Sequence, residues 1–150
     1  MDESIGKISL SFTVRFLIPP SVNRYKIAGK FTDRNTGAVR FGYKLSKATK
    51  AYYEAVAIFA RGDSVTPLDD KDKPKARYEV WVDIYLGKGQ RGDEDNFAKT
   101  AIDALVKARV IHSDAKCHSH ITVHDDHRDS ILSPRTEYRV IRRFEDAKEG

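Results

Sequence analysis

Four stretches of the chain have the residue pattern of β-strands, and two of them alternate strictly between apolar and polar positions. The predicted strands are residues 8–18, 77–86, 118–124 and 136–144. The first is rich in β-branched and aromatic residues and stops at Pro19-Pro20, because proline cannot continue a strand ladder. The second alternates most clearly, with Tyr78, Val80, Val82 and Ile84 on one face.

Apolar residues at helical spacing fill two further stretches. Ser46 is expected to cap a helix that runs to about Ala60, and a second helix is predicted over residues 96–108. The resulting order, β-α-β-α-β-β, predicts an α/β fold with a small mixed sheet and two helices packed on it. A length of 150 residues suits one such domain over the whole chain, with residues 1–7 and 145–150 as frayed tails.

The composition excludes some classes of protein and indicates a cellular setting. No run of 18 or more apolar residues is present, so no membrane-spanning helix is expected. Met1 to Lys7 lacks the apolar stretch of a secretory signal. The lone cysteine, Cys117, cannot form an internal disulfide, so a reducing, cytoplasmic setting is expected.

The positive charge of the chain is concentrated in one segment. The whole chain has a net charge of +5, and the segment from Arg24 to Lys44 alone accounts for it, with six basic residues and one acid, Asp33. Aromatic residues are interleaved with the charges, and such a basic, aromatic loop suits a phosphate backbone. A solvated loop with a short hairpin is the alternative interpretation.

An acidic cluster occupies the string RGDEDNFAKTAIDAL, from Arg91 to Leu105. Asp93 and Asp95 are two residues apart where an extended segment turns into a helix, so their side chains are expected to converge. On the helix, Asp95, Lys99 and Asp103 follow one line at four-residue spacing. Such hard oxygen ligands suit Mg²⁺, although Asp95 as a helix cap and an Asp95–Lys99 ion pair would explain the same pattern.

Three blocks, in this order, resemble the RusA-type Holliday junction resolvases. PPSVNRY (Pro19 to Tyr25) resembles the family's PPS-x-NRY signature. RGDEDNFAKTAIDAL resembles its R-x-D-x-D-N-x-x-K-x-x-x-D-A-L block, which is highly specific. VIHSDAK (Val110 to Lys116) resembles the segment that ends in an acidic pair before a strand, with Ser113 in place of the first acid.

The resemblance implies an endodeoxyribonuclease that resolves Holliday junctions by symmetric nicking in DNA recombination and repair. Mg²⁺ is the implied cofactor, with Mn²⁺ as a substitute. By position, Asp93, Asp95 and Asp114 would hold the metal and Lys99 would support catalysis. A homodimer is implied, since a four-way junction has two equivalent strands to cut. Its partner would be branched DNA, with no membrane and no small-molecule substrate.

DNA contacts are expected from the basic segment and its surroundings. The residues are Asn23, Arg24, Lys26, Lys30, Arg34, Arg40, Lys44 and Arg91. A catalytically inactive DNA-binding module with the same fold is the alternative function. A helix-turn-helix regulator is disfavoured, because a predicted strand separates the two helices.

All five histidines lie between His112 and His127, around Cys117. His118, His120 and His124 fall on one face of a predicted strand, with Ile121 and Val123 on the other. Two interpretations remain open from this pattern. Imidazole and thiolate groups are good zinc ligands, but the same alternation describes a strand that faces solvent or DNA.

Overall fold

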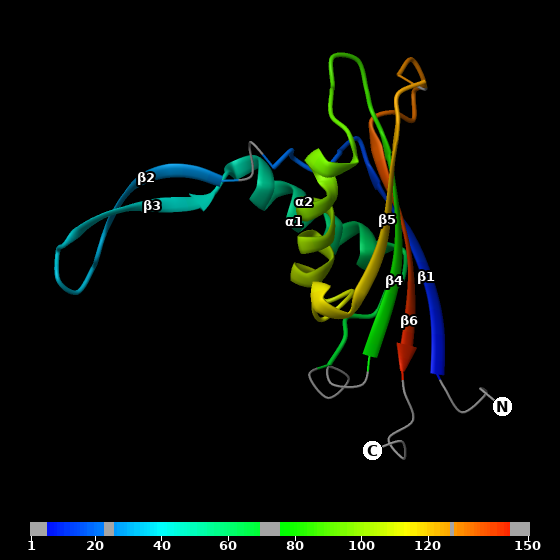
Figure 1. Ribbon diagram of the computed structural model, residues 1–150, viewed down its shortest axis with the longest axis horizontal. Helices are drawn as coiled ribbons and strands as arrows, with labels where there is room; N and C mark the ends of the chain where they lie inside the picture. The colour runs from blue at the N-terminus through cyan, green and yellow to red at the C-terminus, as the bar shows by residue number, and fades with distance from the viewer. Residues whose placement is uncertain (1–5, 23–25, 70–75, 127, 145–150) are drawn as a thin grey trace.

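A four-stranded mixed sheet with two helices packed on one face forms the body of the protein (Figure 1). The computed structural model describes residues 6–22, 26–69, 76–126 and 128–144. The strands are β1 (Gly6–Arg15), β2 (Lys26–Thr32), β3 (Val39–Leu45), β4 (Ala76–Tyr85), β5 (Cys117–His124) and β6 (Arg135–Phe144). The helices are α1 (Lys47–Gly62), α2 (Glu94–Lys107) and a short 3₁₀ helix, η3 (Asp114–Lys116). The predicted α/β class is confirmed.

The sheet has the strand order β1-β6-β4-β5, and its strands run in both directions. β6 pairs antiparallel with β1 and β4, whereas β4 and β5 are parallel neighbours. A parallel pair needs a crossover connection, which α2 provides. As a result, α2 begins at the end of the sheet where β4 finishes and ends near the point where β5 starts.

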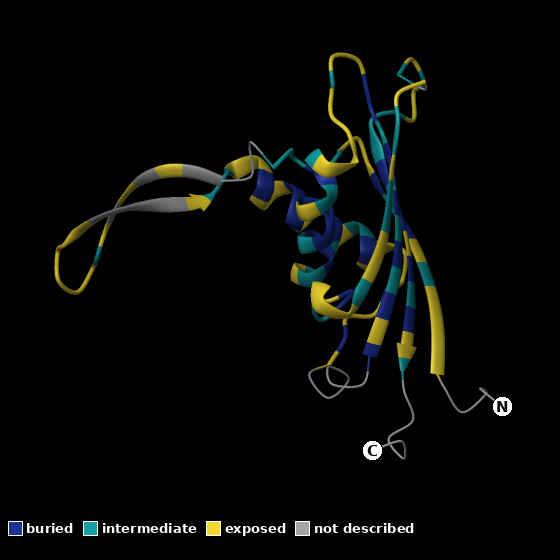
Figure 2. Ribbon diagram, in the orientation of Figure 1, coloured by how far each residue is buried: buried dark blue, intermediate teal, exposed yellow. Residues whose placement is uncertain are grey.

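The core lies between the sheet and the two helices (Figure 2). The predicted alternation of β4 is confirmed, because Tyr78, Val80, Val82 and Ile84 are all buried. Tyr138 of β6 ties the layers together: its hydroxyl lies 2.7 Å from that of Tyr52 on α1 and donates to the Ala101 carbonyl of α2 at 3.1 Å. Complete burial raises the pKa of both tyrosines, so they remain neutral hydrogen-bonding groups.

The bounds of β1 and α2 differ most from the prediction. β1 begins at Gly6, which pairs with Phe144, so residues 6 and 7 belong to the sheet and not to a frayed tail. Residues 1–5 and 145–150 lie outside the described residues. β1 ends at Arg15, before the two prolines, because Phe16 has a φ of 68° and leaves the extended conformation. α2 starts at Glu94, two residues earlier than predicted.

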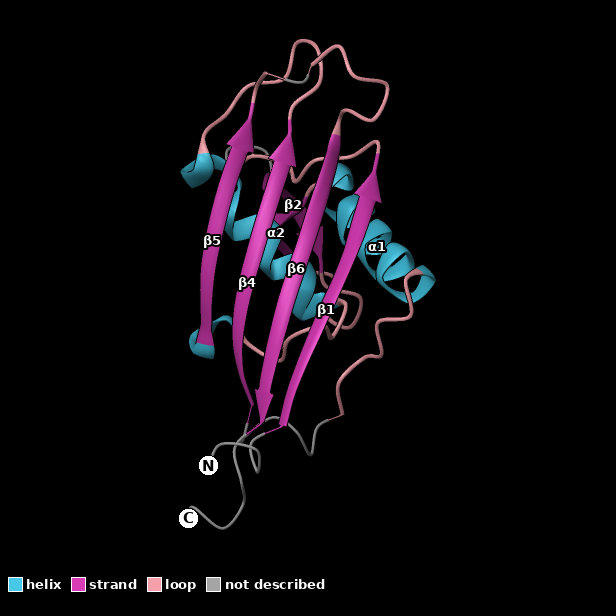
Figure 3. Ribbon diagram, turned by 90° about the vertical axis from the view of Figure 1, so that its right-hand side faces the viewer, coloured by secondary structure: helices cyan, strands magenta, loops and turns pink. Residues whose placement is uncertain are grey.

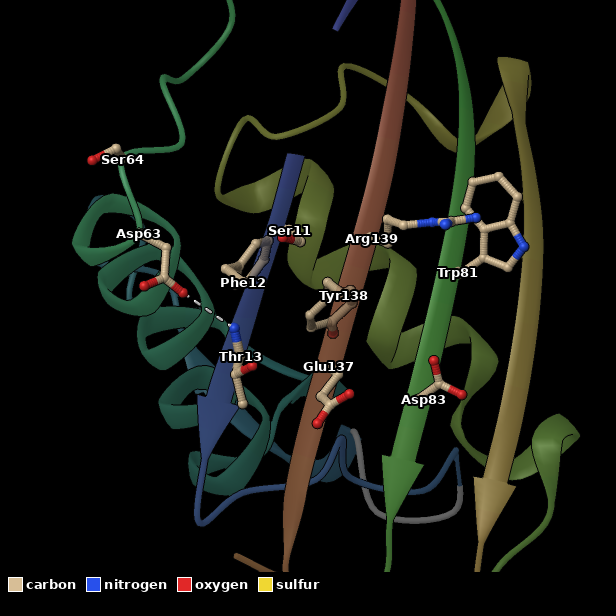
Figure 4. A pocket seen from close by; sticks show the side chains of 10 residues that line it. All are labelled: Ser11, Phe12, Thr13, Asp63, Ser64, Trp81, Asp83, Glu137, Tyr138 and Arg139. Carbon is tan, nitrogen blue, oxygen red and sulfur yellow. Dashed lines mark hydrogen bonds between the residues drawn. The ribbon is translucent and has the colours of Figure 1, made fainter. Parts of the chain in front are cut away.

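The sheet face that the helices do not cover is open (Figure 3). Two stacks of matching composition cross it from β6 to β5. In one, Arg139 lies 4.0 Å above the Trp81 ring, which stacks on His120 with 5.2 Å between ring centroids. In the other, the Arg135 guanidinium lies 3.6 Å from the centroid of the Tyr85 ring, and this ring stacks on His124 with 4.3 Å between ring centroids. Figure 4 shows Arg139 extending from β6 across to Trp81 on β4.

Candidate functional site

The basic segment forms a two-stranded hairpin, β2–β3, that projects from the body (Figure 1). Its single acid, Asp33, shapes the turn. The Asp33 N–H donates to the Ala38 carbonyl at 2.8 Å, and its Oδ1 accepts from the Asn35 N–H at 2.8 Å. Asp33 therefore has a turn-forming role typical of aspartate, and the remaining charged residues of the hairpin are all cations.

The predicted DNA contacts fall into three groups in the structure. Lys30, Arg34 and Lys44 are exposed on the hairpin, and Arg91 is exposed in the loop before α2. Lys26 and Arg40 have backbone positions in β2 and β3, but their side chains are not described. Asn23 and Arg24 lie outside the described residues.

Asp93 and Asp95 lie at the start of α2, and both are exposed. The cap is Asp93, not Asp95. Asp93 Oδ1 accepts from the Asn96 N–H at 3.2 Å, while Asn96 Oδ1 accepts from the Asp93 N–H at 2.9 Å. Asn96 thus completes a reciprocal capping box. Asp95 already lies within the helix. The prediction that Asp93 and Asp95 converge on an extended backbone is therefore wrong, although both carboxylates lie at the same end of α2.

The loop before α2 is held by groups that the sequence interpretation missed. Gly92 has a φ of 146°, and a Cβ atom at this position would lie 2.5 Å from the Phe97 ring. Arg128 donates to the carbonyls of Gly87 and Gln90 at 2.9 Å and 2.7 Å. Only glycine fits at position 92 without displacing Phe97, and Arg128 fixes the path of the loop that leads to Asp93.

The first two sequence blocks meet in space, although residues 26–90 lie between them along the chain. The Val22 N–H donates to the Asn96 carbonyl at 2.8 Å, and the Thr100 hydroxyl donates to the Pro20 carbonyl at 2.5 Å. A groove lies between them, lined by Ile18, Pro19, Ser21, Arg91, Gly92 and Asn96 among others. The segment that leads into the basic hairpin is therefore bonded to the acidic start of α2.

Lys99 lies one turn beyond Asp95 on α2, and half of its side-chain surface is exposed. Its Nζ lies 3.3 Å from Asp103 Oδ2, an ion pair at the four-residue spacing that the sequence pattern contained. An exposed pair of this kind contributes about 0.2–0.5 kcal/mol to stability. The lysine therefore has an ammonium group at the surface, within one turn of both the acidic start of the helix and Asp103.

Asp114 lies apart from the other two aspartates. It is the exposed first residue of η3, whose N-cap is Ser113, and it precedes β5. α2 lies between them, and 14 helical residues span about 21 Å. Among the described residues, three metal-ligating side chains come together only at Glu79, His118 and His120, within 4.8 Å. Within a single chain, Asp93, Asp95 and Asp114 therefore do not come together around one ion.

The two carboxylates at the start of α2 nevertheless match the number of protein ligands that Mg²⁺ usually takes. Mg²⁺ usually takes one or two carboxylates and keeps several waters for a phosphate to displace. Asp93 and Asp95 supply two exposed carboxylates, and the cap uses only Oδ1 of Asp93. They lie beyond the carboxyl end of β4, and ligands of open α/β sheets bind at such ends.

Comparisons with known proteins do not identify a family. No family model matches this chain, and no curated protein matches it. In the part of the chain that the structure describes, no helix is long and apolar enough to cross a membrane. β4 separates α1 from α2, so these two helices do not form a helix-turn-helix unit.

Proposed function

We propose that this protein is a Mg²⁺-dependent endodeoxyribonuclease that cuts four-way DNA junctions as a homodimer. The observation that carries the proposal is the hydrogen-bonded contact between residues 20–22 and α2. It joins a cationic hairpin, which suits a phosphate backbone, to an end of a helix with two exposed carboxylates and a lysine. The resemblance of the same two blocks to the RusA-type resolvases supports this proposal.

The hairpin binds DNA mainly through charge. Lys30, Arg34 and Lys44 are exposed on an element that extends away from the body (Figure 2). Cations on such an arm reach phosphates without base-specific contacts, so binding depends on the shape and charge of the DNA.

Replacing Lys30, Arg34 and Lys44 with glutamine should weaken the binding of every DNA shape and flatten its salt dependence. Each lost phosphate contact should reduce the slope of log K against log salt by about 0.9, because fewer counterions are released. Fluorescence anisotropy over a salt series measures the slope. Glutamine at Lys7, an exposed residue of β1 in the body, provides the control. An unchanged slope in the triple variant would show that the hairpin does not contact DNA.

The reaction would be hydrolysis of a phosphodiester, with the groups at the start of α2 around the phosphate. Asp93 and Asp95 would hold Mg²⁺, which when bound polarises a phosphate oxygen and orients water. Lys99 stabilises the negative charge that develops on the phosphate and the leaving oxygen. Lys99 would act as a cation and not as a general base, because its ammonium forms an ion pair with Asp103.

A second copy of the chain would supply the third carboxylate. Mg²⁺–oxygen bonds are about 2.0–2.1 Å long, so Asp114 cannot share an ion with Asp95 of its own chain across the length of α2. Two α2 helices packed antiparallel about a two-fold axis place the start of each beside the end of the other. Such a dimer has two composite sites related by the symmetry of a four-way junction.

Cleavage of a synthetic four-way junction, a fork and a linear duplex, compared side by side, tests the proposal. We expect Mg²⁺ to produce paired nicks in the junction, Mn²⁺ to substitute, and EDTA to stop the reaction. Binding of the junction without nicking in either metal would instead identify a catalytically inactive DNA-binding module.

A further inference from the structure

We propose that Glu79, His118 and His120 form a binding site for a divalent transition metal of the Zn²⁺ class on the open face of the sheet. This site is separate from the acidic end of α2 and does not depend on the proposed nuclease activity. Its three ligand atoms lie within 4.8 Å of one another, and Glu79 Oε2 is 3.2 Å from His120 Nε2. Small side-chain rotations would bring them to the Zn–N and Zn–O distances of about 2.0–2.2 Å.

The strand register places these side chains together. Glu79 of β4 pairs with His118 of β5, and the next pair on the same face is Trp81 with His120. Opposed residues of paired strands project to the same side of a sheet, so two adjacent strands present all three ligands. The backbone under the site is fixed by the β4–β5 ladder, which reduces the ordering that metal binding requires.

Neighbouring groups already orient two of the ligands. The His120 ring stacks on Trp81, with 16° between the ring planes, and Arg139 covers the other side of Trp81. Arg143 lies 3.5 Å from Oε1 of Glu79, which leaves Oε2 directed toward His120. Such outer-shell contacts set ligand orientation in metal sites. Arg143 also opposes a bound cation by its charge.

The donor set selects the metal. Two imidazole nitrogens and one carboxylate oxygen suit Zn²⁺ and similar borderline cations, whereas Mg²⁺ prefers oxygen ligands alone. Cys117 is not part of the set, because it pairs with buried Tyr78, whose side chain is on the helix-covered face. The zinc interpretation of the histidine cluster is thus retained, without the thiolate.

The second stack on the open face provides a natural comparison. Asp83 lies 2.8 Å from His124 Nε2, as Glu79 lies close to His120, and Tyr85 takes the place of Trp81. Asp83 pairs with Thr122, however, where Glu79 pairs with His118. The two places therefore share a register and a carboxylate–histidine pair, and they differ in the residue two positions before the histidine.

Zn²⁺ titration of the full chain by calorimetry tests the site. We expect one Zn²⁺ per chain, and an affinity loss of more than about 100-fold in His118→Thr and His120→Ala, since even outer-shell changes cost about 10–100-fold. Glu79→Gln should also weaken binding, whereas Arg143→Gln should strengthen it by removing a nearby positive charge. The reciprocal variant Thr122→His should bind a second Zn²⁺ through Asp83, His124 and the new imidazole.

His124→Ala and Asp95→Asn are the matched controls, and both should retain the affinity of the unmodified chain. Circular dichroism of each variant confirms that it is folded. The absence of saturable Zn²⁺ binding in the unmodified chain would overturn the proposal. So would equal binding by His118→Thr and His124→Ala, or a loss of Zn²⁺ binding in Asp95→Asn, since either result places the ion elsewhere.

Discussion

A mixture of Asp95→Asn and Asp114→Asn chains should nick a four-way junction in Mg²⁺, although neither variant alone should do so. Each substitution removes one of the proposed metal-binding carboxylates and should lower cleavage by more than about 100-fold. Loss of even an outer-shell partner of a metal ligand lowers metal affinity or activity by about 10–100-fold. In a mixed dimer, one composite site contains both substitutions, and the other contains neither. Random pairing should therefore restore roughly a quarter of the wild-type sites.

The products of the mixture provide a second readout. A mixed dimer has one working site, so it should leave a singly nicked junction, whereas the wild-type dimer should release two resolved duplexes. Asp95 is the better choice for this experiment than Asp93, because Asp93 also caps α2. Continued inactivity of a mixture that demonstrably exchanges subunits would mean that the carboxylates do not combine across two chains. Unimpaired junction binding by each variant serves as the folding control.

Replacing Lys99 with alanine should lower the single-turnover cleavage rate by roughly 10²–10³, the usual cost of losing one donor that stabilises transition-state charge. DNA binding should change little, because one phosphate contact is a small part of a large electrostatic footprint. Arginine should restore little activity, since its planar guanidinium does not replace a compact ammonium at the same point. Enzyme in excess over junction isolates the chemical step from product release.

Asp103→Asn is the matched control for Lys99→Ala, because it breaks the 3.3 Å ion pair and keeps the ammonium. If the ion pair were the whole role of Lys99, both variants would lose the same small stability, about 0.2–0.5 kcal/mol, and cleave alike. The catalytic interpretation requires a large rate loss in Lys99→Ala only. A rate within about threefold of wild type in folded Lys99→Ala would contradict it.

Local patterns in the sequence were sufficient to predict most of the fold. The alternation in β4 and the cap at Ser46 depend on neighbouring residues, so they can be read without knowledge of the tertiary structure. The alternative that Asp95 caps α2 is wrong, because Asp93 is the N-cap and Asp95 already lies within the helix. The signal was present, since Asp93 and Asn96 have the spacing of a reciprocal capping box.

The arrangement of the candidate sites was harder to predict, because it depends on contacts between distant segments. The distance between Asp95 and Asp114 follows from the parallel crossover, which places the two ends of α2 at opposite ends of the sheet. The approach of Glu79 to His118 and His120 depends on the β4–β5 register, which periodicity does not specify. Residues 20–22 meet α2 through backbone and hydroxyl groups that no side-chain pattern reveals.

The stacking of Trp81 between Arg139 and His120 has an optical consequence. Trp81 is the single tryptophan of the chain, so all indole emission originates from one ring on the open face of the sheet. That emission can report on the charge and packing of its two neighbours without an added label. The Trp81 ring lies on the face of the sheet opposite α2. Detecting changes around α2 by fluorescence would therefore require a second fluorophore.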